Sequence, residues 1–265
     1  VDNLAGSGLQ SEHGLSFLVE TENGSVLFDT GQTGIWARNL LSMGLEMGSI
    51  RAVALSHGHY DHSGGLAAFA DRFPGIPCYV HPDCLRERYS AHDGVSRSIG
   101  IPAESRASGV DFHFGSDPVE VLPGVTLSGE IPVEAERCSG FPNPSLLGSD
   151  GTTPDTFMDE QCLVLTEDGF TGVLLGCSHR GVENNLLAAM DIAGTERLDL
   201  VVGGMHLANA PESRLREVAS FVDALDVGAI VPCHCTGIRE AEFIARAVGD
   251  RVTPGRTGMQ WRTGG

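Results

Sequence analysis

The sequence predicts an α/β (α+β) fold in which sheets are flanked by helices. Its first half reads as hairpins and turns, whereas its C-terminal part alternates between helical and strand patterns. This order of elements is typical of sheets that are covered by helices. No shift in composition marks a domain boundary, so we expect one domain over residues 1–265, long enough to bury a substantial core.

In the first half, apolar alternation around Asn23-Gly24 indicates a hairpin, and helical spacing follows it. The predicted elements are strands over residues 15–20 and 25–28, a helix over 34–43, a strand over 51–56, a helix over 65–73 and a strand over 76–80. Residues 82–116 and 141–159 are rich in glycine, proline and polar residues, so we expect irregular loops that shape a pocket.

The C-terminal part shows clearer periodicity, with Asp168-Gly169 as a turn and Pro211 in the first turn of a helix. The predicted elements are strands over residues 162–166 and 170–176, a helix over 182–193, a strand over 198–202, a helix over 211–225, a strand over 229–232, a helix over 238–248 and a final strand over 258–262.

The charge balance restricts the class of partner. Thirty-five acidic residues face 17 basic ones, which gives a formal net charge of −18. Such a surface repels nucleic-acid phosphates, and no basic run offsets it locally. No apolar run approaches the roughly 18 residues that a membrane helix needs, and no secretory leader is recognisable. We therefore expect a cytoplasmic protein that acts on a small molecule, with no membrane and no nucleic-acid partner; nothing indicates an oligomeric state.

The cysteines predict reduced thiols. Their number is odd, and no short repeated spacing suggests a disulfide framework. They are Cys78, Cys84, Cys138, Cys162, Cys177, Cys233 and Cys235. If the chain around His234 stays extended, its two neighbouring cysteines point to the opposite side and are expected to be packing thiols.

Four predicted strands each run into a histidine. These residues are His57, His179, His206 and His234. In sheet proteins with helices outside, ligands collect beyond the carboxyl ends of the strands. A single such histidine could simply hydrogen-bond a loop, but four together favour one shared site.

A dense group of metal-ligating residues follows the strand over residues 51–56. His57, His59, Asp61 and His62 lie within six residues, and imidazole and carboxylate are usual ligands of zinc and iron. In a tight loop, the first two histidines can point at one metal while Asp61 and His62 point at a neighbour. A solvated histidine-rich turn is the alternative, but the preceding buried strand and nearby glycines favour metal binding.

The stretch Ser56-His57-Gly58-His59-Tyr60-Asp61-His62-Ser63-Gly64-Gly65-Leu66 matches the HxHxDH signature of the metallo-β-lactamase superfamily, which the chain therefore resembles. Leu27-Phe28-Asp29-Thr30-Gly31 resembles that superfamily's strand-end aspartate. Further motifs resemble the subgroup called dihydropteroate-synthase-like, or 7,8-dihydropterin-6-methyl-(ribofuranosyl)aminobenzene 5′-phosphate synthase-like. They are Val1-Asp2-Asn3, Glu12-His13-Gly14-Leu15-Ser16, Gly176-Cys177-Ser178-His179-Arg180-Gly181, Gly203-Gly204-Met205-His206-Leu207 and Cys233-His234-Cys235-Thr236-Gly237.

The resemblance implies a four-layer αββα sandwich with two divalent metal ions at one edge of its sheets. Zinc is the expected metal, with iron or manganese as alternatives. The implied ligands are His57, His59 and His179 for the first metal, and Asp61, His62 and His234 for the second. Asp29 would orient the histidine loop, as residues behind metal ligands commonly do.

The sequence departs from the superfamily pattern at Cys177, where a strand ending in Gly-Asp usually supplies a bridging aspartate. Cys177 would be a thiolate ligand, or only water bridges the metals while His179 takes over; the second alternative is slightly favoured. His206 is a candidate ligand, general acid or substrate contact. His13 and Arg180 are candidate substrate-binding residues, the first equally able to cap a turn and the second equally a surface arginine.

Two metals of this kind imply hydrolysis or a related transfer, because they lower the pKa of a shared water and polarise a carbonyl or phosphoryl oxygen. We expect metal-bound hydroxide as the nucleophile, and Asp61 and His206 are the candidate catalytic residues. The subgroup implies a small, phosphorylated or pterin-like substrate. The alternatives are a di-iron redox protein that reduces oxygen or nitric oxide, which usually needs a flavin module not recognised here, and a non-catalytic metal- or ligand-binding protein.

Overall fold

The first sheet of the molecule is built from the N-terminal hairpin and three parallel strands. The computed structural model describes residues 1–134, 143–225 and 227–263. The sheet has the order β1-β2-β3-β4-β7, in which β1 and β2 are antiparallel and the other neighbours are parallel. Its strands are β1 (Phe17–Thr21), β2 (Gly24–Phe28), β3 (Ile50–Ala54), β4 (Pro77–Val80) and β7 (Asp111–Phe114). The helical segments among them are α1 (Ile35–Ser42), η1 (Met47–Ser49), α2 (Tyr60–Ser63), α3 (Leu66–Arg72), η2 (Pro82–Leu85) and α4 (Ala103–Arg106).

The second sheet has six strands in the order β14-β13-β12-β11-β9-β8. The neighbours from β12 to β14 are parallel, and those from β8 to β12 are antiparallel. The strands are β8 (Val119–Leu122), β9 (Val125–Leu127), β11 (Leu163–Glu167), β12 (Phe170–Leu175), β13 (Leu200–Gly204) and β14 (Ala229–Cys233). The accompanying helical segments are α5 (Val182–Ala193), α6 (Glu212–Ala224), η4 (His234–Thr236) and α7 (Ile238–Val248).

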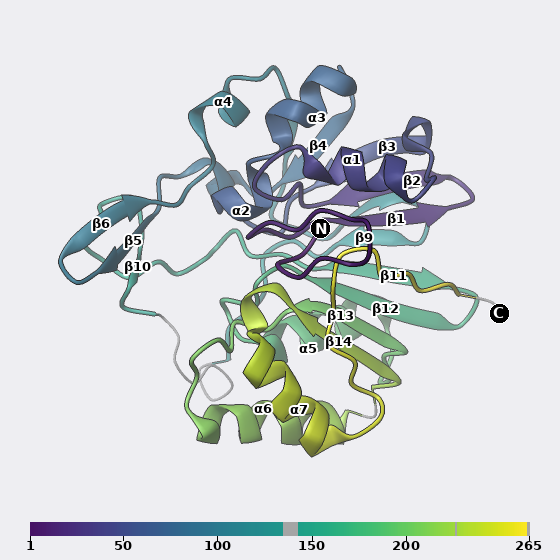
Figure 1. Ribbon diagram of the computed structural model, residues 1–265, viewed down its shortest axis with the longest axis vertical. Helices are drawn as coiled ribbons and strands as arrows, with labels where there is room; N and C mark the ends of the chain where they lie inside the picture. Colours follow the sequence, from purple (N-terminus) through teal and green to yellow (C-terminus); the bar gives the residue numbers. More distant parts are fainter. Residues whose placement is uncertain (135–142, 226, 264–265) are drawn as a thin grey trace.

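Three apolar layers hold these elements together. Between the sheets, side chains such as Phe28 of β2 and Leu163 of β11 share one buried cluster. Trp36 of α1 packs with Phe69 of α3 on the outer face of the first sheet. A third cluster joins α5, α6 and α7 to the second sheet, and Figure 1 shows these helices below it and α1 and α3 above the first. The predicted four-layer αββα sandwich is confirmed.

A small third sheet corrects the expectation that residues 82–116 are irregular. It consists of β5 (Tyr89–His92), β6 (Val95–Ser98) and β10 (Leu146–Leu147), and it projects from the sandwich (Figure 1). Asp93 and Gly94 connect β5 to β6 with φ angles of 51° and 75°. These positive φ angles fit a two-residue hairpin turn, for which Asp-Gly is a favoured pair. The expected loop over 141–159 begins outside the described residues, which also exclude Cys138, and contains β10.

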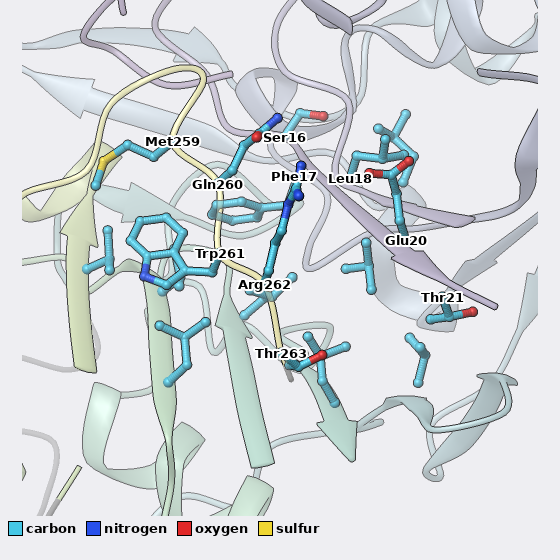
Figure 2. Close-up of a pocket in the computed structure, with 18 of the residues that line it drawn as sticks. Ser16, Phe17, Leu18, Glu20, Thr21, Met259, Gln260, Trp261, Arg262 and Thr263 are labelled. Carbon is cyan, nitrogen blue, oxygen red and sulfur yellow. The ribbon is translucent and has the colours of Figure 1, made fainter. Parts of the chain in front are cut away.

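The predicted final strand over residues 258–262 is wrong, because these residues pair with no strand. The free edge of β14 is already taken by the preceding segment, since Thr253 N donates to Ile230 O at 2.9 Å and Ile230 N donates to Arg251 O at 2.8 Å. The C-terminal segment instead lines a cleft of about 900 Å³ together with β1. Figure 2 shows Met259 and Trp261 on this segment and Phe17 on β1. None of the described helices is both long and apolar enough to traverse a bilayer.

Candidate metal centre

Sharp turns at the ends of four strands bring the predicted site residues together. Asp29, Ser178, His206 and His234 follow β2, β12, β13 and β14 closely, and they have positive φ angles of 59°, 59°, 48° and 51°. Such left-handed conformations are uncommon for residues with a side chain and concentrate at functional sites. Because β12, β13 and β14 are parallel neighbours, their carboxyl ends adjoin, and the loops that follow them converge.

The first group of candidate ligands consists of His57, His59 and His179, each from a turn after a strand or the loop that it opens. One ring nitrogen from each lies within 4.8 Å of the others. Among the described residues, the Nε2 atom of each of these three histidines is buried without a hydrogen-bond partner. A buried nitrogen left unpaired is costly, so three such nitrogens side by side indicate a site that is suited to a metal ion.

Burial also sets the protonation state of this first group. It lowers the pKa of His59 to about 3, and it lowers the pKa values of His57 and His179 well below their usual value. The neighbouring histidines act in the same direction for His57 and His179. The three rings are therefore neutral at pH 7, which is the form that ligates a metal.

The second group consists of Asp61, His62 and His234. The Nε2 atoms of the two histidines are 3.2 Å apart, and Asp61 Oδ2 lies 3.3 Å from His234 Nε2 and 4.0 Å from His62 Nε2. Although burial opposes the shift, the charge of His62 and hydrogen bonds from His13 and His234 hold the pKa of Asp61 well below its usual value. Two ring nitrogens thus converge with the oxygen of an ionised carboxylate.

Asp29 contacts the histidine loop from the side away from the candidate metal ligands. Its Oδ2 atom lies 2.6 Å from His62 Nδ1, and its carboxylate accepts the backbone N–H and the hydroxyl of Ser56, each at 2.7 Å. Burial opposes protonation of His62, but the Asp29 and Asp61 carboxylates raise its pKa to about 9. The contact fixes the ring of His62 so that its Nε2 atom faces Asp61 and His234.

Two buried acidic residues that sequence reasoning missed support the first group. Asp159 accepts the backbone N–H of Gly58 at 2.8 Å and pairs with Arg88 Nη2 at 2.6 Å. Glu160 accepts the backbone N–H groups of His179 and Arg180, the latter at 2.6 Å. These contacts span long sequence separations and follow no local motif, so no pattern in the sequence indicates them. They fix the backbone between His57 and His59 and at His179.

Phe157 is a second kind of residue that the sequence does not single out. Its ring stacks on that of His179 with a centroid distance of 3.9 Å and an interplanar angle of 9°, and its edge contact with His59 has a centroid distance of 5.4 Å. Phe157 is itself buried. The aromatic ring therefore restricts the orientation of two imidazoles of the first group.

The N-terminal segment fixes His234 in the second group. Asn3 Oδ1 lies 3.1 Å from His234 Nδ1, and Asn3 Nδ2 donates to the His234 carbonyl at 3.3 Å. Asp2 Oδ1 accepts the backbone N–H of His234 at 2.8 Å. The same Asn3 Oδ1 accepts the N–H of Gly14, next to His13. The Val1-Asp2-Asn3 motif thus contacts a candidate ligand that is distant in sequence, with its Nε2 left facing Asp61.

The cysteines partly contradict the sequence expectation. Cys177 lies within the site, with its Sγ atom 3.2 Å from His62 Nε2. The chain does not stay extended after β14 but turns into η4, so Cys235 also faces the site. The prediction that Cys235, like Cys233, points away from His234 as a packing thiol is therefore wrong. Burial opposes the shift, but hydrogen bonds with Cys177 and His206 lower the pKa of Cys235 well below its usual value.

The remaining candidates lie at the periphery of the two groups. The His206 ring is 4.3 Å from that of His179 between centroids, and its Nδ1 atom is buried without a partner among the described residues. The half-exposed His13 side chain places Nε2 3.2 Å from Asp61 Oδ2. Arg180 is buried, and its Nη1 atom pairs with Glu130 Oε1 at 3.0 Å. The structure therefore places His206 beside the first group and His13 beside the second, whereas an acidic neighbour engages the guanidinium of Arg180.

The two groups together offer nitrogen, oxygen and sulfur donors around adjacent positions. His57, His62 and Cys177 form one further set of donor atoms within 4.8 Å of one another, so Cys177 lies between the two groups. Neutral imidazoles and a carboxylate are suited to divalent zinc or iron. The residues present therefore fit divalent metal ions, whereas the cleft shown in Figure 2 lies elsewhere and is lined by none of these histidines.

Comparisons with known proteins agree with this geometry. The sequence model of the Metallo-beta-lactamase superfamily matches residues 11–143. The chain is 28% identical, over 86% of its length and 82% of the relative, to 7,8-dihydropterin-6-methyl-4-(beta-D-ribofuranosyl)-aminobenzene-5'-phosphate synthase of Methanocaldococcus jannaschii. The crystal structure of a metal-dependent hydrolase of the beta-lactamase superfamily superposes with a TM-score of 0.84 at 30% identity, covering 99% of this chain and 96% of that one.

A more distant structure shows the fold alone. Zinc-bound PqqB from Methylobacterium extorquens has a TM-score of 0.54 at 15% identity, covering 95% of this chain and 86% of that one. The family match over residues 11–143, together with the likeness to the hydrolase over nearly the whole chain, is decisive. The chain therefore belongs to the metallo-beta-lactamase superfamily and is a metal-dependent hydrolase of that superfamily with a histidine-rich candidate metal site.

Proposed function

We propose that the chain hydrolyses a small molecule with two divalent metal ions, zinc being the expected metal. The observation that carries this proposal is the buried triad of Nε2 atoms on His57, His59 and His179, next to the converging second group. These three atoms have no hydrogen-bond partner in the part of the chain that the structure describes. A solvated histidine-rich turn would not bury three imidazoles without partners. The geometry supports binding of a cation at this triad.

The proposed ligands follow from the two groups. His57, His59 and His179 hold the first metal, and Asp61, His62 and His234 hold the second. Asp29 orients His62. Cys177 lies close enough to both groups to be a ligand as well, which supports the thiolate alternative over a bridge of water alone.

When bound, two such metals lower the pKa of a shared water from 15.7 toward about 7 and polarise the bond that is to be broken. The residues of the chain orient this chemistry. His206 lies beside the first group, and its Nδ1 atom has no partner within the described ranges, so this side chain can hold a proton for the leaving group. Burial opposes protonation of His206, but its hydrogen bond with Cys235 raises its pKa. Asp61 stays ionised beside His62 and His234, where it balances the charge of His62.

The proposed substrate class is a small phosphorylated or pterin-like compound. The support is the relative from Methanocaldococcus jannaschii, whose name describes a pterin-aminobenzene phosphate product. His13, half-exposed beside Asp61, is the proposed substrate contact at the entrance. Arg180 is proposed as a second contact, and a phosphate there would share the guanidinium with Glu130.

The proposal is tested by removing all metal, reloading with zinc, iron or manganese separately, and assaying phosphoesters, lactones and thioesters. We expect hydrolysis by the zinc form and its loss in His59→Ala, with His92→Ala as a control because His92 is an exposed residue of β5. Oxygen or nitric oxide reduction by the iron form without any hydrolysis would support the redox alternative instead. Binding of metal without turnover of any ester would support a non-catalytic binding protein.

Three further expectations stay predictions. They are the cytoplasmic location, the lack of a nucleic-acid partner that the net charge of −18 indicates, and the organisation of residues 1–265 as a single domain. A nitrocellulose filter assay with labelled single-stranded DNA and RNA tests the second, and retention of either at low salt would contradict it.

A further inference from the structure

Two thiols meet at the edge of the second group, across the end of strand β13. Cys177 follows β12 and Cys235 follows β14, and these strands are not neighbours, because β13 lies between them. Even so, Cys235 Sγ is 3.5 Å from the Cys177 carbonyl oxygen. The turns beyond the strands therefore bring the cysteines closer than the spacing of the sheet would.

Gly204, at the end of β13, makes this approach possible. A Cβ atom on Gly204 would lie 2.6 Å from Cys235 Sγ and 3.3 Å from Cys177 Cα. Any larger residue would push the thiol of Cys235 away. Because Gly204 of β13 has no side chain, there is space above it for the thiols that follow β12 and β14.

The two sulfur atoms lie at the position that His234 also reaches. Cys177 Sγ, Cys235 Sγ and one ring nitrogen of His234 all lie within 4.8 Å of one another. Cys177 Sγ is in addition 3.2 Å from His62 Nε2, which belongs to the second group. Two thiols and two imidazoles therefore face one small volume, and sulfur and nitrogen are the usual ligands of a tetrahedral zinc ion.

We infer that Cys177 and Cys235 both act as sulfur ligands of the metal at the second group, with His62 and His234 beside them. This inference rests on the proposed metal centre and specifies its composition. A thiolate pair makes this position softer than one built from histidine and carboxylate only. It therefore selects zinc or cadmium over manganese, which prefers oxygen ligands.

Cys233 provides a matched control in the same segment. Cys233 is buried on β14 and lines the cleft shown in Figure 2 rather than the candidate metal centre. A Cβ atom built on Gly255 would lie 2.7 Å from the Cβ atom of Cys233. Cys233 is neither a member of the candidate metal groups nor a neighbour of Cys177 in them. Replacement of Cys233 by serine changes a buried thiol close in sequence without touching the proposed sulfur pair.

The test uses cobalt as a spectroscopic probe in the full chain, kept reduced. Thiolate ligands give Co(II) an intense near-ultraviolet charge-transfer absorption, whereas imidazole and carboxylate ligands do not. We expect this absorption in the wild type, a loss of about half in Cys177→Ser and in Cys235→Ser, complete loss in the double variant and no change in Cys233→Ser. Retention of the full absorption in Cys235→Ser would overturn the inference.

A measurement on the wild type covers the case in which a variant does not fold. X-ray absorption at the zinc edge separates zinc–sulfur distances of about 2.3 Å from zinc–nitrogen distances of about 2.0–2.1 Å. We expect two sulfur atoms shared among two zinc ions, and a fit with no sulfur would contradict the inference. In that last case bound zinc still upholds the proposed metal centre, whereas a chain that binds neither cobalt nor zinc contradicts both.

Discussion

The two groups of candidate ligands differ in how their polar atoms are satisfied in the bare protein. In the first group, the Nε2 atoms of His57, His59 and His179 are buried with no hydrogen-bond partner among residues 1–134, 143–225 and 227–263. In the second, Asp61 and His234 already contact each other, and Asp29 pairs with His62. The first group is thus built almost wholly for a cation, whereas the second is partly stabilised by its own charges. We therefore expect loss of the first metal to damage function most and the second group to tolerate loss of its metal better.

The largest effect is expected from His59→Ala. The change removes one of three nitrogens of the first group, and the remaining two cannot complete a site for zinc. Activity should fall by more than the roughly 100-fold that removal of a supporting residue costs. Steady-state kinetics with bound metal counted in parallel checks this, and near-normal turnover with one metal missing would reverse the ranking of the two groups.

A smaller effect is expected from Asp29→Asn, which acts on the second group through His62. The charged contact of 2.6 Å that orients the ring is weakened, so affinity for the second metal should fall about 10–100-fold. Competition with a chelating dye measures the affinity. Asp71→Asn, an exposed carboxylate on α3, is the control. Equal affinities for the two variants would show that Asp29 does not support a ligand.

Asn3→Leu should have a still smaller effect on the same group. The side chain of Asn3 fixes His234 through a neutral contact of 3.1 Å, and its loss should weaken the second metal by about 10-fold, the lower end of the range for supporting residues. The first metal should be unaffected. Asn23→Leu, in the exposed turn between β1 and β2, is the control, and weakening of both metals alike would indicate general damage to the fold.

The smallest effect is expected from pH on the metal-free protein. The pKa of His62 is raised from 6.5 to about 9, so the folded chain keeps a proton that the unfolded chain releases at lower pH. Its contribution to stability is complete below pH 6.5 and is lost as pH rises through about 9. Urea denaturation across this window should show a declining free energy of unfolding. If the free energy of unfolding of His62→Asn declines with pH as steeply as that of the wild type, groups other than His62 cause the decline.

The features that could be predicted from sequence are local ones. His57 to His62 are contiguous, and the histidines after β12, β13 and β14 stand directly at strand ends, so chain order alone indicates a shared site. The Asp93-Gly94 pair is a local signal for the β5–β6 hairpin. The polar, glycine- and serine-rich composition around this pair favours a loop instead, so the hairpin was not predicted. The prediction of a final strand is wrong because residues 251–253 already pair with the edge of β14. No local sequence pattern indicates which segment takes that edge.

The supporting residues could not be predicted, because their roles arise from contacts between distant segments. Asp159 reaches Gly58 across 101 positions, and Asn3 reaches His234 across 231. Cys235 was misassigned for a related reason: its direction depends on the turn into η4, with His234 at a φ angle of 51°, rather than on strand alternation. Sequence thus indicates the candidate ligands, and tertiary structure is needed to identify the residues that contact and orient them.

The count of metal ions per chain tests the central claim most directly. Native mass spectrometry of the full chain, titrated with zinc after complete metal removal, resolves species with none, one and two ions. We predict two in the wild type, and one each in His59→Ala and His234→Ala, because each variant disables one group. A wild type that never exceeds one zinc ion, or two ions retained in both variants, would contradict a dinuclear centre built from these two groups.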